Sequence, residues 1–252
     1  MSPRVSIVVP IRGEGEHIEG FLESLFDRVT LPCEVLAVYE DRDDPTVAHL
    51  RAYAQHESRL VPTHHSGGGG PALALRYGID HAEADVIVVI MADGSDDPSQ
   101  IDALTNLVER GVVVAAASRY MKGGQQVGGP LLKSWASRVA GVSLYWLARV
   151  GTRDAANSFK AYNRAFVEAV GIDSDTGFEM GIELVAKARR RGLPVAEIPT
   201  IWLDTGSTPS NFRIVSWMPR YLRWYRHAFG RRVDQPVTDT GVETTAWRHQ
   251  AG

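Results

Sequence analysis

The stretch VIVVIMADGSDDP, from Val86 to Pro98, decides the fold and points to the site. Its first residues, Val86 to Ile90, are all apolar, which is typical of a strand buried on both faces in a parallel sheet covered by helices. Three carboxylates follow at once, at Asp93, Asp96 and Asp97. Ligands of open α/β sheets bind at the carboxyl ends of the strands, and carboxylate oxygens suit hard cations such as Mg²⁺ or Mn²⁺. The stretch therefore predicts a site for a metal and a diphosphate. The alternative is an Asp-rich turn in which Ser95 or Asp96 caps the next helix.

Length and composition are those of an ordinary globular protein. The chain has 252 residues, of which 44% are hydrophobic and 23% charged, which suits one large α/β domain with a substantial core. The single cysteine, Cys33, cannot form an internal disulfide, so we expect a reducing compartment, the cytoplasm. No signal-peptide layout precedes the first apolar run, and no run reaches the roughly 18 apolar residues of a transmembrane helix. We therefore expect no membrane-spanning segment.

Strands and helices alternate along the first half of the chain. Apolar runs predict strands at 4–10, 34–39, 60–63, 86–91 and 112–117, with helices at 14–26, 46–55, 72–82 and from 98 to about 109. This alternation indicates right-handed crossovers and a mainly parallel sheet flanked by helices. Further elements are expected as helices at 131–150, 177–191 and 219–229 and a strand at 195–201. We interpret 1–230 as a single domain, with accessory helices at 131–150 and 213–230, and 231–252 as a flexible tail.

The net charge of −3 hides two segments without any acidic residue. One lies between Arg110 and Arg153 and the other runs from Thr205 to Val233, and both contain arginines and aromatic residues. Such segments fit phosphate-bearing partners or an anionic membrane surface, or they are ordinary solvated faces. The helix at 219–229 either lies in a membrane interface or packs its aromatic face on the sheet or on a second subunit, as in a homo-oligomer. We expect no nucleic-acid partner.

Two acidic strand ends, at Glu40 and Asp93, flank the glycine run Gly67 to Gly70. One carboxylate can accept hydrogen bonds from a base or ribose, the other can hold a cation on a diphosphate, and amides at a glycine-rich helix start favour anions. This layout suits a nucleoside diphosphate, although the glycine run on its own is better explained as a hinge. The first strand is not followed by GxGxxG and no GxxxxGK[ST] occurs, which argues against a dinucleotide-binding fold and a phosphate-loop ATPase.

An ordered series of blocks extends from Val5 to about Tyr225. It comprises SIVVP, EVLAVYED, PALALRYGID, VIVVIMADGSDDP, ASRYMKGGQQVGG, RDAANSFKAY, GFEMGIEL and EIPTIW. In these blocks the chain resembles family-2 glycosyltransferases of the GT-A fold, and among them the dolichol- or polyprenyl-phosphate mannosyltransferase group. The resemblance implies an inverting, metal-dependent transfer of a hexose from a GDP- or UDP-linked sugar, with Mg²⁺ or Mn²⁺ as cofactor. The acceptor it implies is a polyprenyl phosphate, which the chain would meet as a peripheral protein at the inner face of a membrane; a hydroxyl acceptor is the alternative.

The resemblance also implies roles for single residues. The residues of the nucleotide-sugar pocket are Pro10, Glu14, Ala92, Asp93 and, as partner of the base, Glu40. The metal site comprises Asp93 and, nearby, Ser95. The phosphate of the acceptor or donor is held by Arg119, Lys133 and Ser137. The catalytic set is Asp93, Arg119 and Asp96.

The chain departs from the family pattern at several positions. Tyr39 stands where an acid is usual, Met91 replaces the first aspartate of the DxD-like motif, and three late positions that often carry basic residues are Leu203, Asn211 and Phe212. A nucleotide-sugar-binding protein with impaired catalysis is therefore one alternative, and a nucleotidyltransferase that makes the activated sugar is another.

A phosphate acceptor is already anionic and needs no general base. A hydroxyl acceptor needs a carboxylate to take its proton, and the candidates are Asp96, Asp97, Glu179 and Glu183.

Overall fold

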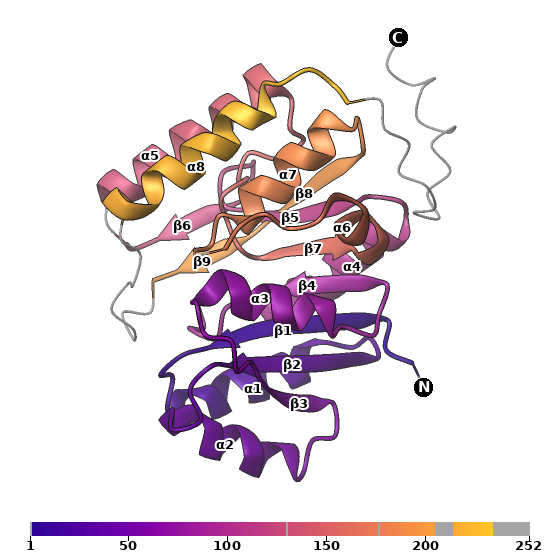
Figure 1. Cartoon of the computed structure of the whole chain (residues 1–252), viewed down its shortest axis with the longest axis vertical. Coiled ribbons are helices and arrows are strands. Elements are labelled where there is room, and N and C mark those ends of the chain that lie inside the picture. The colour runs from indigo at the N-terminus through magenta and orange to yellow at the C-terminus, as the bar shows by residue number, and fades with distance from the viewer. Residues whose placement is uncertain (1, 130, 176, 205–213, 234–252) are drawn as a thin grey trace.

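A computed structural model of the chain describes residues 2–129, 131–175, 177–204 and 214–233, with the side chains of 131–133 and 214–217 left out (Figure 1). Its centre is a seven-stranded sheet with the strand order β3-β2-β1-β4-β7-β5-β8. The strands are β1 Val5–Ile11, β2 Cys33–Tyr39, β3 Leu60–His64, β4 Val86–Val89, β5 Val114–Ser118, β7 Lys160–Asn163 and β8 Val195–Pro199. All neighbours pair in parallel except β7, which is antiparallel to both β4 and β5. The predicted mainly parallel sheet is confirmed.

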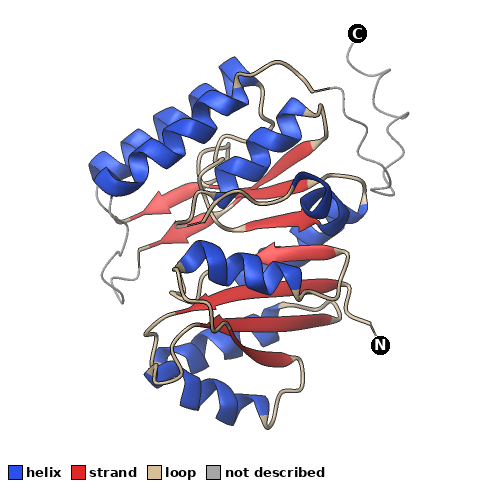
Figure 2. Ribbon diagram, in the orientation of Figure 1, coloured by secondary structure: helices blue, strands red, loops and turns tan. Residues whose placement is uncertain are grey.

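Helices cover both faces of this sheet (Figure 2). One hydrophobic core contains α1 His17–Arg28, α2 Pro45–Ala54 and α4 Ile101–Glu109, the last preceded by a 3₁₀ turn, η1 Pro98–Gln100. The core on the opposite face contains α3 Pro71–Asp80, α6 Arg164–Val170, α7 Met180–Arg190 and the end of α8 Ile214–Ala228. In β1, Ile7 packs into the first core and Val8 into the second. The continuous apolar runs of the sequence are thus explained by strands buried on both sides.

Several elements differ from the sequence prediction, among them β7 and α6, which were not expected. The loop expected after Arg119 contains a short strand, β6 Gln125–Val127, which pairs in parallel with β9 Ile201–Leu203. The strand expected at 195–201 therefore ends at Pro199 and resumes as β9 in this separate sheet. The helix expected at 131–150 is α5 Leu131–Ser143 followed by a π-helical turn, η2 Leu144–Ala148, which ends at Arg149 with φ of 55°. β6 shows neither an apolar run nor a regular alternation, so the sequence gives little sign of it.

The topology brings the loops after β1, β2 and β4 to one edge of the sheet, because these neighbouring strands are parallel. Of the predicted tail, residues 231–233 lie against α7, where the Val233 amide donates to the Arg190 carbonyl at 2.7 Å, and 234–252 lie outside the described residues. In the described part of the chain no helix combines the length and the apolar character needed to cross a bilayer.

Candidate active site

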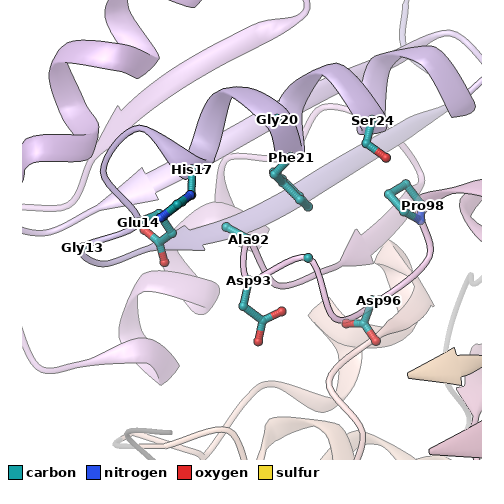
Figure 3. Close-up of a pocket in the computed structure, with 11 residues that line it drawn as sticks. Gly13, Glu14, His17, Gly20, Phe21, Ser24, Ala92, Asp93, Asp96 and Pro98 are labelled. Atoms are coloured by element: carbon teal, nitrogen blue, oxygen red, sulfur yellow. The ribbon is translucent and has the colours of Figure 1, made fainter. Parts of the chain in front are cut away.

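A cleft of about 270 Å³ opens at this edge of the sheet, between the start of α1 and the loop after β4 (Figure 3). Its wall brings together four of the predicted site residues, Glu14, Ala92, Asp93 and Asp96. The other lining residues are Gly13, His17, Gly20, Phe21, Ser24, Gly94 and Pro98. Two chain segments about 80 residues apart in sequence therefore meet here because β1 and β4 are neighbours in the sheet.

The loop after β4 orients Asp93 through a tight local turn. The Asp93 carboxylate accepts hydrogen bonds from the Ser95 amide at 3.0 Å and the Ser95 hydroxyl at 2.6 Å, and Gly94 between them has φ of 71°. Ser95 is buried, so its hydroxyl is positioned to hold the carboxylate. The capping alternative is wrong in its residue, because Asp97 caps η1 through the Ser99 amide at 3.1 Å and pairs with Arg28.

Asp96 is the buried acid of the cleft. One of its oxygens, Oδ1, has no hydrogen-bond partner among the described residues. Burial, together with the nearby Asp93 carboxylate, raises the pKa of Asp96 to about 7. Glu14 is affected in the same direction: burial raises the pKa of its carboxyl, which accepts from the Arg12 amide at 2.7 Å. A bound cation would therefore stabilise the ionised form of both carboxyl groups.

Behind the cleft, Arg119 is held by Asp154. The guanidinium donates to the two carboxylate oxygens at 2.7 and 2.9 Å, the Arg119 amide donates at 3.0 Å, and Asp154 is fully buried. The guanidinium also lies over the rings of Tyr120 and Trp202. Such bidentate geometry fixes the orientation of the arginine. Asp154 lies in the block RDAANSFKAY, but the sequence does not indicate its role, since only the fold brings it to Arg119.

Lys160 is a further buried charge that the sequence analysis missed. It lies in β7 with no exposed surface, donates to the Asn157 carbonyl, and burial lowers its pKa to about 7. Asp154, Arg119 and Asp96 all act on it electrostatically. We refer to Asp96, Arg119, Asp154 and Lys160 as the buried charge cluster.

Other predicted site residues lie outside the cleft wall. Pro10 is in β1, and Glu40, after β2, accepts from the amide of Gly70 at 2.9 Å, at the start of α3. Ser137 of α5 hydrogen-bonds the Tyr120 phenol, which links α5 to the segment carrying Arg119. The side chain of Lys133 lies outside the described residues, as do the departures Asn211 and Phe212.

Three of the departures fall on described residues with different environments. Met91, after β4, is half-buried. Tyr39 is buried, and its hydroxyl lies 3.4 Å from an Arg51 nitrogen. Leu203 is exposed in β9.

The candidate bases on α7 are distinguished by their hydrogen bonds. Glu183 accepts from the amides of Asp173 and Ser174 at 2.6 and 2.9 Å and from Lys187 at 2.5 Å, so it ties a loop to the helix. Glu179, at the start of the helix, is equally buried, but its Oε2 has no partner among the described residues. Of the two, only Glu179 keeps an oxygen available to a ligand.

Among the described residues there is no group of three or more His, Cys, Asp or Glu side chains that could hold a metal ion. The donor set at the cleft comprises the carboxyl groups of Asp93 and Asp96 on the same loop. These hard oxygen donors fit Mg²⁺ or Mn²⁺ only if a ligand supplies further oxygens, as a diphosphate would.

Comparisons with known proteins find related sequences and structures. A polyprenol monophosphomannose synthase from Mycolicibacterium smegmatis is 27% identical over 210 residues, covering 80% of this chain and 78% of the relative. A dolichol-phosphate mannosyltransferase from Pyrococcus furiosus is 28% identical over 208 residues, covering 78% of this chain and 55% of the relative.

Solved structures share the fold at lower identity. A mannosyltransferase from Pyrobaculum calidifontis, in complex with GDP-Man and Mn²⁺, aligns with a TM-score of 0.61 and 20% identity over 89% of this chain and 63% of that chain. A glucosyl-3-phosphoglycerate synthase from Mycobacterium tuberculosis, in complex with Mn²⁺, UDP and glucosyl-3-phosphoglycerate, aligns with a TM-score of 0.65 and 16% identity over 92% of this chain and 82% of that chain. The expected GT-A fold is confirmed.

The family is decided by the sequence model for glycosyl transferase family 2, which matches residues 6–171. This range contains the cleft wall, the loop after β4 and the whole buried charge cluster. The chain belongs to glycosyl transferase family 2.

Proposed function

We propose that the chain transfers a hexose, with inversion, from a GDP- or UDP-linked sugar to a polyprenyl phosphate, with Mn²⁺ or Mg²⁺ as cofactor. The observation that carries the proposal is the loop after β4, which brings Asp93 and Asp96 to the cleft wall with Glu14, where one buried oxygen of Asp96 has no hydrogen-bond partner among the described residues. The names of the mannosyltransferase relatives support the acceptor, and the Mn²⁺ complexes of the structural neighbours support the cofactor.

In this reaction the protein places the acceptor and stabilises the negative charge that builds on the departing diphosphate. Asp93, held by Ser95, and Asp96 would hold the divalent cation, which when bound supplies charge neutralisation at the diphosphate. Arg119 adds a fixed positive charge behind the cleft, and Asp154 keeps its fork oriented. A phosphate acceptor is already an anion, so no residue has to remove a proton from it.

A polyprenyl-phosphate acceptor places the reaction at a membrane surface. We propose that residues 1–230 form one catalytic domain that works from the cytoplasmic side as a peripheral protein. Lys133 and Ser137, on the helix that contacts Tyr120 beside Arg119, are the residues we assign to the acceptor phosphate.

A second candidate follows from Met91 and from the small donor set at the cleft. With one carboxylate fewer than the family pattern, the chain would bind a nucleotide sugar without transferring it. This candidate predicts nucleotide binding with neither transfer nor donor hydrolysis.

The deciding experiment substitutes Asp93→Asn and compares it with Asp80→Asn, a conservative change at an exposed residue of α3 that does not line the cleft. Sugar transfer from GDP-mannose and UDP-glucose to a polyprenyl phosphate is measured with Mn²⁺, and nucleotide binding is followed by calorimetry. We expect Asp93→Asn to lower transfer by roughly 100-fold or more, on the scale of losing one electrostatic contact to the transition state, and to remove the Mn²⁺ dependence of binding. Asp80→Asn should keep both the transfer rate and the Mn²⁺ dependence.

Full transfer by a folded Asp93→Asn protein would refute the role of Asp93. Binding without any turnover in the unmodified protein would favour the second candidate.

A further inference from the structure

Helices α5 and α8, with the turn η2, carry large apolar side chains on the outside of the molecule. Trp135 and Trp146 are 66% and 67% exposed, and Met218 and Leu222 are 51% and 40% exposed. Val139, Leu147 and Phe229 are exposed as well. Scattered apolar residues on a surface are normal, but a contiguous group of this size marks an interaction site.

Apolar residues of these elements form two rows with the same spacing. On α5 and η2 the row is Trp135, Val139, Val142 and Trp146, and on α8 it is Met218, Leu222, Tyr225 and Phe229; Val142 and Tyr225 are half-buried and the others are exposed. Steps of four, three and four residues keep each row on one face of its helix. Other faces of the same elements supply core contacts through Leu144, Ala148, Trp224 and Ala228. Tyr225 also packs against this core, whereas the exposed members of the rows remain available for another contact.

The two rows belong to one surface. The Ser143 hydroxyl at the end of α5 and the Tyr225 phenol of α8 lie 2.9 Å apart, and α8 also contacts η2; both helices lie at the same end of the molecule (Figure 1). We call this surface, with the exposed Arg138, Arg149, Arg223 and Arg226, the α5/α8 face.

The charge of the α5/α8 face selects its partner. Both helices lie in the segments that contain no Asp or Glu, so the charged side chains that they expose among the described residues are basic, and Asp173 next to Arg223 comes from another element. A second copy docked on the same face would bring like charges together, whereas anionic lipid headgroups complement them. Tryptophans beside arginines are the side chains of interfacial helices, with the rings in the acyl boundary and the guanidinium groups at the phosphates.

We infer that the α5/α8 face docks on an anionic lipid bilayer. The inference extends the peripheral attachment of the proposed function by naming the surface and the lipid charge. It does not depend on sugar transfer, because the face is separate from the cleft residues. Its place in the fold suits a lipid-linked acceptor, since α5 also contacts Tyr120 next to Arg119 through Ser137.

The test is sedimentation of the full chain with vesicles of phosphatidylcholine alone and of phosphatidylcholine with 30% phosphatidylglycerol, taken as roughly the anionic fraction at which polybasic surfaces bind. We expect binding to the anionic vesicles that weakens with salt. Trp135→Ser with Trp146→Ser, and separately Arg223→Gln with Arg226→Gln, should each lower the partition coefficient by about tenfold or more.

The matched controls are Val61→Ser, an apolar residue 41% exposed on β3 at the opposite end of the molecule, and Arg110→Gln, an exposed arginine after α4. Both should bind vesicles like the unmodified protein. Donor binding, followed by the thermal shift with GDP- or UDP-sugars and Mn²⁺, should be the same in all variants, which separates failure of this inference from failure of the proposed function.

Absence of binding to anionic vesicles would overturn the inference, and so would equal binding by the tryptophan variant. A dimer in light scattering that Trp135→Ser with Trp146→Ser converts to a monomer, without any vesicle affinity, would assign the face to a second copy and overturn it too.

Discussion

The side chain of Asp96 shows how a single buried carboxyl group links the cleft to the stability of the fold. Its pKa in the folded chain is about 7, raised by burial and by Asp93, whereas an aspartate in an unfolded chain has a pKa of about 3.9. The folded state therefore binds the proton more tightly than the unfolded state. The stability that this proton supplies is complete below about pH 4 and is lost as the pH rises through about 7.

We predict that Asp96→Asn removes this loss in metal-free buffer. The free energy of unfolding of the variant, relative to the unmodified protein, should rise between pH 4 and pH 8 by on the order of 4 kcal/mol, from about three pK units at 1.36 kcal/mol each. Urea unfolding at pH 4 and pH 8 with EDTA measures it.

Lys160 is a second buried group, and its pKa is shifted in the opposite direction. Its folded pKa of about 7 lies below the usual value near 10.4. The stability that its neutral form supplies is therefore present at high pH and is lost as the pH falls through about 7. Lys160→Met should therefore change the pH profile above neutrality, where Asp96→Asn no longer does. Parallel stability profiles for Asp96→Asn and the unmodified protein would contradict the prediction.

At the scale of single residues, the local sequence predicted the acidic residues of the cleft but not the buried charges next to them. Asp93 and Asp96 follow a buried strand directly, so their place at the sheet edge could be predicted from local sequence. Asp154 meets Arg119 across 35 residues, and Lys160 is a cation inside a strand. Neither pairing leaves a local pattern, because the energy that keeps both charges buried comes from the tertiary cluster.

At the scale of elements, close packing of α3 on the sheet depends on Gly78. A Cβ atom at this position would lie 2.5 Å from Val8 Cγ1 and 2.9 Å from Val38 Cγ2, both in strands of the central sheet. The helix approaches the strands this closely only because position 78 has no side chain. The N-cap of α3 is Gly70, whose amide donates to Glu40, so the packing of the helix also positions its start against the loop after β2.

We predict that Gly78→Ala destabilises the protein by about 1–3 kcal/mol, because the cost of overpacking exceeds the helix propensity gained. Gly20→Ala is the matched control in α1, where a Cβ would meet no atom within 4 Å, and it should be neutral or stabilising by up to about 1 kcal/mol. Urea unfolding followed by circular dichroism compares the two. Gly78→Ala at least as stable as Gly20→Ala would show that α3 can shift without cost.

Elements with strong periodicity were predicted, and those decided by tertiary pairing were missed. The strands β1, β2 and β4 are apolar on both faces and stand out from the sequence. β7 was not predicted because the buried Lys160 at its start interrupts the apolar pattern. α6 has only seven residues and is fixed by its cap, in which the Asn163 side chain accepts from the Phe166 amide at 2.9 Å.

At the scale of the whole molecule, the cation and the nucleotide sugar should stabilise the fold only together. The described residues contain no cluster of three metal-ligating side chains, so a divalent ion bound at Asp93 must take most of its oxygens from the diphosphate. Conversely, a diphosphate beside Asp93, Asp96 and Glu14 meets three carboxyl groups and needs the ion to offset their charge.

We predict that Mn²⁺ alone leaves the melting temperature nearly unchanged. The matching GDP- or UDP-sugar with Mn²⁺ should stabilise the fold by about 2.7 kcal/mol at 100 times Kd, and each kcal/mol should raise the melting temperature by about 2–4 °C. A thermal-shift panel of GDP-, UDP- and dTDP-sugars with and without Mn²⁺ measures this, and Asp93→Asn is its control, in which the joint effect should disappear. A large shift with Mn²⁺ alone would mean that the protein itself completes the metal site, and equal shifts with and without Mn²⁺ would mean that the sugar donor binds without the ion.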